Sequence, residues 1–177
     1  MFVLDEKVVY PGHGVAKISR IIDKIVAGSP TRFFELKFLN KDMTILVPID
    51  NLDVVGLRRL SSPDSINTIF KILSEPIDLI PSEMIGNWNK RNKEYQGKLR
   101  TGNLHDICKI YRDLRYISIY KELSFGEKTL LQQTELLLAQ EISLVKKIGE
   151  DKMIEQLRSL CQPMIYSVPS ARSSQLR

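Results

Sequence analysis

The pattern of apolar and polar positions changes near residue 60, and the change predicts two kinds of structure. In the first part, short apolar runs are separated by turn-forming stretches such as PGHG (11–14) and AGSP (27–30). Within RFFELKF, apolar and polar residues alternate, as in a half-buried strand. We therefore expect a small, strongly bent sheet or barrel with strands at 7–10, 15–22, 32–38, 43–48 and 53–58. Unless such a sheet closes, it leaves an edge that can accept a strand from another protein.

Beyond Ser61 the apolar residues recur with helical spacing. The first run reaches Leu73, and Ser62 and Pro63 are typical of a helix start. Two prolines then frame a linker, EPIDLIPSE (75–83). A second helix is expected to carry Trp88, Tyr95 and Leu99 near one face.

The remaining helices are predicted from apolar stripes and capping signals. Ser124 and Glu127 match the S-x-x-E capping box, which predicts a long helix through Lys147 with Gly149 as its C-terminal stop. A last helix is expected at about 151–161. The two stripes expected to face the core are Leu104, Ile107, Tyr111, Leu114, and Leu131, Leu138, Ile142, Val145.

Together these patterns predict an α+β protein, with a small β domain followed by a compact helical domain. We place the β domain at residues 1–60 and the helical domain at 61–162. The remaining segment, 163–177, is polar and rich in serine and arginine, and we expect it to be disordered.

Composition narrows the class of protein. The chain has 177 residues, 43% hydrophobic, and a formal net charge of +5, a mild basic bias that hints at an anionic partner. Two cysteines with no CxxC pair indicate free thiols in a reducing compartment. Asp5 and Glu6 interrupt any signal-peptide core, and no apolar stretch is long enough to span a bilayer. We therefore expect a cytoplasmic protein with no membrane partner.

Catalytic chemistry has few candidates. His13 lies in a turn and His105 at a helix start, and neither is accompanied by a nucleophile, carboxylate or ligand motif. PGHG lacks the length and the lysine of a phosphate loop. We therefore expect no enzymatic activity, no cofactor, no metal site and no small-molecule substrate.

One segment, GNWNKRNKEYQGKLR (86–100), combines the single tryptophan with a basic run. Such a surface can neutralise phosphates without reading sequence, although basic runs are more often solvated helix faces. A large aromatic ring can wedge between or stack on bases, although a lone tryptophan is more often a core anchor. Both alternatives stay open for Trp88 and for the cations Lys90, Arg91, Lys93, Lys98 and Arg100. No arrangement of polar residues resembles a base-reading helix.

Several motifs, in this order and spacing, resemble the CarD/CdnL-type bacterial transcription regulators. The resemblance covers about residues 5–145 and is carried by VVYPGHGV (8–15), MTILVPIDNLDVVGLR (43–58), NWNKRNKEY (87–95), KLRTGN (98–103), YRDL (111–114) and LSFGEK (123–128). It implies a Tudor-like barrel that docks on the β subunit of RNA polymerase. It also implies a helical domain that contacts promoter DNA at the upstream edge of the transcription bubble.

The resemblance also implies roles for individual residues. Trp88 matches the family's minor-groove wedge, followed by the phosphate-gripping Lys90, Arg91 and Lys93, and Phe125 matches an aromatic placed near the tryptophan. In the barrel, the polymerase contacts are matched by Lys24, Leu46 and Pro48. Some relatives carry arginine where this chain has Leu46, so a salt bridge to polymerase is not available here, whereas an apolar contact, as in relatives with methionine, is compatible with the sequence. Gln96 stands where some relatives have an apolar residue, which predicts a smaller patch around the tryptophan.

The resulting hypothesis is a non-enzymatic transcription regulator. It would bind the RNA polymerase β subunit and, without sequence specificity, fork-junction promoter DNA, and so stabilise the open complex. The alternative is a protein-interaction adaptor whose basic helix is only a solvated face.

Overall fold

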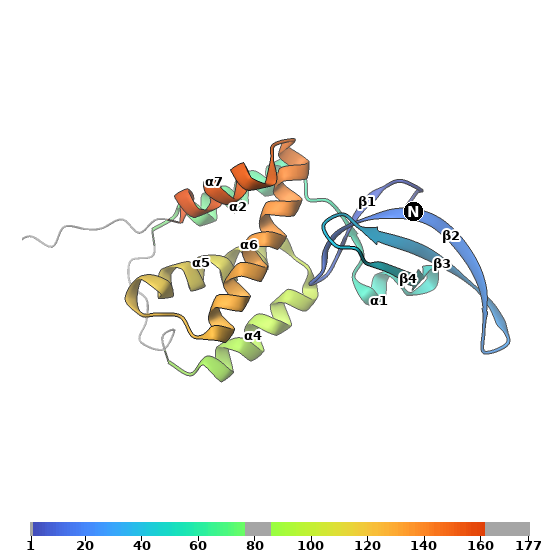
Figure 1. Ribbon diagram of the computed structural model, residues 1–177, viewed down its shortest axis with the longest axis horizontal. Coiled ribbons are helices and arrows are strands. Elements are labelled where there is room, and N and C mark those ends of the chain that lie inside the picture. The colour runs from blue at the N-terminus through green and yellow to red at the C-terminus, as the bar shows by residue number, and fades with distance from the viewer. Residues whose placement is uncertain (1, 77–85, 162–177) are drawn as a thin grey trace, which may run out of the picture.

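The computed structural model describes residues 2–76 and 86–161, which form an antiparallel sheet followed by a bundle of helices (Figure 1). The two parts are called the sheet module and the helical module below. The predicted α+β order is confirmed, with β structure first and helices after it. The sheet consists of β1 (Lys7–Tyr10), β2 (Gly14–Val26), β3 (Ser29–Phe38), β4 (Thr44–Pro48) and β5 (Arg58–Arg59).

The strand order is β4-β3-β2-β1-β5, and every pairing is antiparallel. The longest pairing is the β2–β3 hairpin, which turns through Ala27 and Gly28, both with positive φ, and projects away from the helices (Figure 1). An irregularity between Ile18 and Arg20 shifts the register of this hairpin. Such a bulge bends a strand and increases its twist, which accounts for the curvature of the hairpin.

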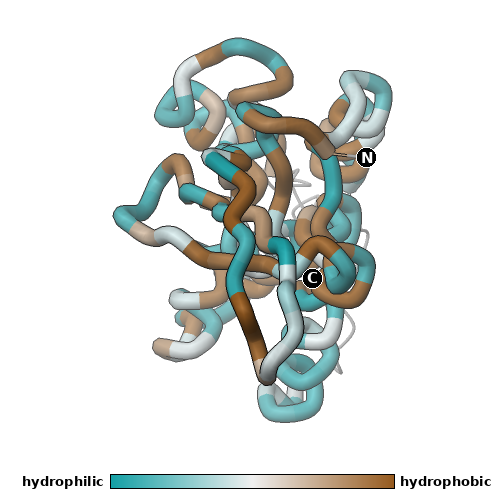
Figure 2. The backbone as a smooth tube through the Cα atoms, turned by 90° about the vertical axis from the view of Figure 1, so that its right-hand side faces the viewer, coloured by the Kyte–Doolittle hydropathy of each residue, from teal (hydrophilic) through white to brown (hydrophobic). Residues whose placement is uncertain are grey.

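The sheet module has a hydrophobic core of its own on one face of the sheet. Figure 2 shows hydrophobic and hydrophilic residues interspersed along the strands that face the viewer. The buried residues of this core are Val8, Ala16, Ile18, Phe34, Leu36, Phe38, Val47 and Leu57.

One of the five predicted strands is wrong. Residues 49–55 form a short 3-10 helix, η1 (Ile49–Asn51), and one α-helical turn, α1 (Leu52–Val55), and only Arg58–Arg59 pair as a strand. Gly56 adopts φ 72° at the end of α1, and this left-handed residue reverses the chain. The apolar run DVVGLR resembled a strand because a single helical turn is too short to show helical periodicity.

The helical module comprises α2 (Pro63–Ser74), α4 (Trp88–Thr101), α5 (Leu104–Tyr120), α6 (Phe125–Lys146) and α7 (Glu150–Leu160). The predicted caps are confirmed: Ser62 accepts a hydrogen bond from the Ser65 amide, and Ser124 and Glu127 form a complete capping box. The prediction that Gly149 stops α6 is wrong. Lys147 ends α6 in a left-handed conformation, and Gly149 is the N-cap of α7.

The helices enclose a second hydrophobic core, separate from that of the sheet. The predicted inner residues of α5 and α6 are confirmed: the α5 stripe, Leu138 and Ile142 are buried, and Leu131 and Val145 pack against the cluster. Cys108 and Cys161 lie in this core as free thiols. The predicted linker and tail fall largely on residues 77–85 and 162–177, which lie outside the described residues.

Candidate nucleic-acid interface and sheet surface

Helix α4 begins at the tryptophan of the basic segment because Asn87 caps it. The Asn87 side chain accepts a hydrogen bond from the Lys90 amide at 3.3 Å. The buried face of the helix consists of Arg91, Tyr95 and Leu99. With 3.6 residues per turn, this face leaves the other four basic side chains of the segment on the opposite face or at its edges.

Four of the five cations are exposed on this helix. Helical periodicity places Lys90, Lys93 and Arg100 together on the outward face, and Lys98 closer to the buried edge. Within residues 2–76 and 86–161, none of the four has a carboxylate oxygen within 4.0 Å, whereas nine other cations do. These charges are therefore not neutralised by the neighbours that the structure describes.

Arg91, the fifth cation, is placed differently from the sequence-based expectation of a phosphate contact. It is 8% exposed, and its Nη2 donates to Glu127 at 2.7 Å. The Glu127 side chain is fully buried and also accepts from Lys121 Nζ at 2.9 Å. The basic run shows no sign of this pairing because the partner lies 36 residues further along the chain. Arg91 thus anchors α4 to the start of α6.

The ionised state of Glu127 is strongly favoured. Burial by itself would raise the pKa of this carboxyl, but hydrogen bonds from Lys121, the Ser124 amide and Arg91 outweigh burial and lower the pKa to about 2. A single carboxylate therefore caps α6 and holds two cations from other segments.

Trp88 is neither fully buried nor free. Its ring is half-buried and packs against the edge of the helical core. The guanidinium carbon of Arg91 lies 5.6 Å from the ring centroid, a cation–π arrangement. A Cβ atom on Gly126 would lie 3.1 Å from the ring, so the indole rests directly on the backbone of the first turn of α6. One side of the ring is therefore fixed while another part remains accessible.

Phe125 is a second aromatic residue close to this contact in the chain. It is the first residue of α6 and is 87% exposed, the highest exposure among the large apolar residues that the structure describes. It directly precedes Gly126, against which Trp88 packs. The exposed Phe125 thus precedes the glycine that Trp88 contacts, and the exposed cations of α4 begin at Lys90, two residues after Trp88.

The three residues assigned to the barrel contact share one face of the sheet. Leu46 lies opposite Glu35, Pro48 opposite Phe33, and Lys24 opposite Thr31. Because Thr31, Phe33 and Glu35 alternate along β3, they and their partners point to the same side, away from the core residue Phe34.

Sequence reasoning did not single out the residues that fill the space between these three. Phe33 pairs with both Pro48 and Ile22, and both Phe33 and Ile22 are half-buried. They join Leu46 and Pro48 in a continuous apolar strip that leads to Lys24. The alternation in RFFELKF could have indicated Phe33, since it places this residue on the face opposite to Phe34.

Strand β4 is an edge of the sheet, because β3 is its one partner among the described residues. Its outer backbone groups can therefore pair with a strand of another protein.

Comparison with known proteins decides the family. Residues 2–61 match the CarD-like/TRCF RID domain, and residues 68–158 match the C-terminal domain of CarD. The chain belongs to the CarD family. It is similar to the putative transcription factor YdeB of Bacillus subtilis (strain 168), with 24% identity over 155 residues, 86% of this chain and 97% of that protein. The N-terminal domain of Myxococcus xanthus CarD is 29% identical, with a TM-score of 0.30, and the match covers 33% of this chain and 79% of that domain.

As a CarD-family protein, the chain is a transcription regulator that interacts with RNA polymerase and is not an enzyme. The two histidines lie in ordinary structural positions. His13 packs edge-on against Tyr10 and Phe38, and His105 lies at the start of α5. No cluster of three metal-ligating side chains occurs among the residues that the structure describes. In the same residues, no helix has both the length and the apolar character required to cross a membrane.

Proposed function

We propose that this CarD-family protein binds the β subunit of RNA polymerase and, without reading sequence, promoter DNA at the upstream edge of the transcription bubble. By binding both, it stabilises the open complex. The observation that carries the proposal is the group of exposed cations on α4, the helix that begins at Trp88, together with the exposed Phe125 at the start of α6. This combination is suited to DNA, because cations can contact its phosphates and aromatic rings can contact its bases.

The DNA contact would have two parts. Lys90, Lys93 and Arg100 share one face, where they can neutralise successive phosphates and release counterions, and Lys98 lies at its edge. Trp88 and Phe125 supply the aromatic surface that can insert at, or stack on, an unpaired base step. The phosphate contacts would offset the cost of unstacking, which is about a few kcal/mol per step.

Arg91 would act on DNA indirectly in this account. Its guanidinium lies against the Trp88 ring and pairs with Glu127, so it fixes the orientation of the indole relative to the first turn of α6. A preorganised ring loses less conformational entropy when it binds.

The polymerase contact would use the strip of Leu46, Pro48 and Phe33 together with Lys24 on the outer face of the sheet. The neighbouring edge of β4 offers main-chain hydrogen bonds to a strand of the β subunit. Leu46 belongs both to the apolar strip and to the edge strand β4, and its side chain lies on the outer face of the sheet.

A protein that binds melted promoter DNA more tightly than closed DNA shifts the equilibrium between them and needs no covalent step. Because it would act on polymerase at the promoter, we place it in the cytoplasm. The alternative is a protein-interaction adaptor whose helical module binds a protein and whose basic helix is only a solvated face; it has no affinity for forked DNA.

Capture of the isolated β subunit tests the polymerase contact. The variant Leu46→Lys places a charge in the apolar strip, where the cross-strand neighbour Glu35 can pair with it and preserve the sheet. We expect this variant to fold and to lose β-subunit binding. The matched control is Val54→Lys, which alters an 84% exposed apolar residue of α1 outside the strip. Equal capture of both variants would contradict the proposed surface.

A further inference from the structure

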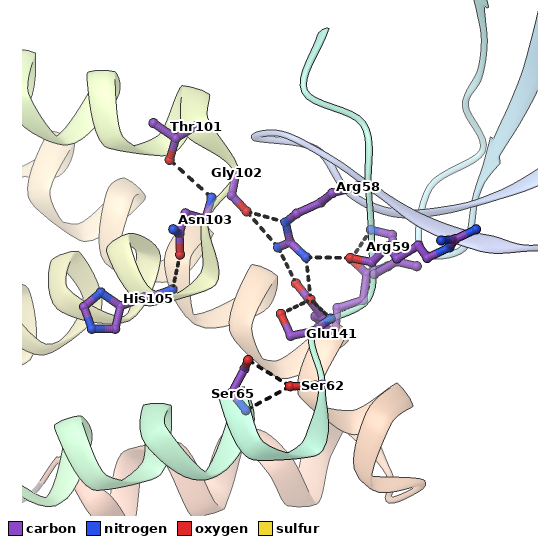
Figure 3. A network of polar contacts seen from close by, with 12 residues as sticks. Arg58, Arg59, Ser62, Ser65, Thr101, Gly102, Asn103, His105 and Glu141 are labelled. Carbon is purple, nitrogen blue, oxygen red and sulfur yellow. Dashed lines mark hydrogen bonds and ion pairs between the residues drawn. The ribbon is translucent and has the colours of Figure 1, made fainter. Parts of the chain in front are cut away.

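The two modules are joined by an arginine of the sheet whose contacts reach two segments of the helical module (Figure 3). Arg58, in β5, donates from Nη1 and Nη2 to the two carboxylate oxygens of Glu141 in α6, both at 2.8 Å. Its Nε and Nη2 also donate to the carbonyl oxygen of Gly102, at 2.9 and 2.7 Å. The guanidinium thereby links the sheet to α6 and to the end of α4.

Glu141 completes this network from the helical side. Its side chain is 3% exposed, and Oε1 also accepts from the Ser61 amide and hydroxyl, at 2.8 and 2.7 Å. Ser61 belongs to the short connection between β5 and α2, so the same carboxylate fixes the chain that joins the modules. Because a bidentate pair with additional donors has strict geometric requirements, it restricts the orientation of the sheet module relative to the helical module.

Two close backbone contacts reinforce the joint. Gly102 lies so near the ring of Pro11 that a Cβ atom there would be 2.9 Å from it. Gln140 in α6 accepts a hydrogen bond from the Val15 amide at 3.1 Å and packs on Gly14. The motifs PGHG and TGN, which have no part in the proposed binding surfaces, therefore meet at this joint.

We infer that Arg58 is a positioning residue. Together with Glu141 it holds the sheet module and the helical module as one rigid bracket, which sets the separation of the polymerase-facing strip from the DNA-facing helix. The functional part of this inference rests on the proposed function; the rigidity itself does not.

A rigid bracket acts differently from a flexible tether. A tether raises the local concentration of the second site and tolerates many geometries. A bracket presents the second site in one geometry, and so favours the particular DNA shape that matches it. Each module has its own hydrophobic core, so loosening the joint can free the orientation without unfolding either part.

A distance measurement on the full chain tests the rigidity. Spin labels are attached at Ser29→Cys, by the hairpin turn, and at Gln96→Cys, on α4, both exposed positions. The native Cys108 and Cys161 are buried and burial raises their pKa values to about 12 and about 11, so they stay unlabelled. Double electron–electron resonance then gives the distribution of distances between the modules.

We expect one narrow distribution for the parent protein and a clearly broader one for Arg58→Ala. The control is Arg158→Ala, which breaks a comparable ion pair with Glu135 inside the helical module, and its distribution stays narrow. If Arg58→Ala does not fold, Gln140→Ala, which removes the contact to Val15, is measured in its place with the same expectation. A broad distribution in the parent, or a narrow one in the joint variant, overturns the inference.

A second arm tests the positioning role. Arg58→Ala should capture the β subunit and bind forked DNA separately within about twofold of the parent, yet lose most of its effect on open-complex lifetime. An unchanged lifetime together with a broadened distribution overturns the positioning role. If the parent protein itself binds neither partner, the proposed function fails, while the distance distributions still decide whether the bracket is rigid.

Discussion

The indole of Trp88 rests on the backbone of Gly126, where a Cβ atom would lie 3.1 Å from the ring carbon Cζ2. Gly126 is in the first turn of α6, next to the exposed Phe125. The contact therefore joins the start of α4 to the start of α6 and brings two aromatic side chains to one corner of the helical module. Because Trp88 is the single tryptophan of the chain, its fluorescence reports on this corner alone.

Replacement of the two aromatic residues should separate stability from function. Full burial of a large aromatic ring is worth about 3–5 kcal/mol, and surface substitutions usually stay within about 0.5 kcal/mol. Trp88 is half-buried, so we expect Trp88→Ala to cost about 1–3 kcal/mol, measured by chemical denaturation. Phe125→Ala should cost less than about 0.5 kcal/mol, because the side chain is 87% exposed.

Both aromatic variants should shorten the lifetime of open complexes while leaving β-subunit capture unchanged. Equal lifetimes for the Phe125→Ala variant and the parent protein would remove Phe125 from the DNA contact.

Arg91 should behave unlike its basic neighbours. Arg91→Ala leaves the buried carboxylate of Glu127 without one of its cations, and loss of one partner from a buried pair costs about 3–5 kcal/mol. Lys93→Ala, in the same helix, removes an exposed charge and should change the unfolding free energy by less than about 0.5 kcal/mol. Denaturant titration of the two variants checks this, and equal stability would contradict the buried pairing.

The exposed cations should determine the salt dependence of DNA binding. Each lost phosphate contact lowers the slope of log K against log salt by about 0.7–0.9. The triple variant Lys90→Ala, Lys93→Ala, Arg100→Ala should therefore bind forked DNA more weakly and with a flatter slope, whatever the sequence.

The control for this variant removes the same net charge elsewhere, at three exposed lysines of β1, β3 and α7: Lys7, Lys37 and Lys152. It should keep the parent slope. An identical slope in the test and control variants would favour the adaptor with a solvated basic helix.

The low pKa of Glu127 makes the free energy of unfolding depend on pH in the acid range. The folded pKa of about 2 lies below the ordinary value of 4.5, so the contribution is fully present above about pH 4.5 and is lost as pH falls toward 2. One pKa unit corresponds to about 1.4 kcal/mol, which makes the contribution about 3 kcal/mol. The stability difference between the parent and Glu127→Gln should therefore shrink over this range. A difference that is independent of pH would show that Glu127 is not the linked group.

The sequence carried enough information for the elements with regular periodicity. The apolar stripe from Leu104 to Leu114 and the capping box at Ser124 depend on local spacing alone, and the structure has both. The single turn of α1 differs from the predicted strand because DVVGLR is equally compatible with both. Gly149 caps the start of α7 and does not stop α6, because a glycine between two helices fits either role.

The contacts between distant segments could not be predicted from spacing. Arg91 stands in a basic run, and its burial follows from Glu127, 36 residues away. Arg58 and Glu141 are 83 residues apart, and nothing local distinguishes them from surface charges. Lys24, Leu46 and Pro48 share one face of the sheet. This could be predicted only with knowledge of the strand register, including the irregularity after Ile18.

Simultaneous contact with polymerase and DNA is proposed to stabilise the open complex. The most direct test is the lifetime of open complexes on one promoter after addition of a competitor, with polymerase alone, with the parent protein, and with each single-surface variant. We expect the parent protein to extend the lifetime several-fold, and Leu46→Lys or the triple variant of α4 to extend it little or not at all. If the lifetime with the parent protein equals that with polymerase alone, the protein does not stabilise the open complex.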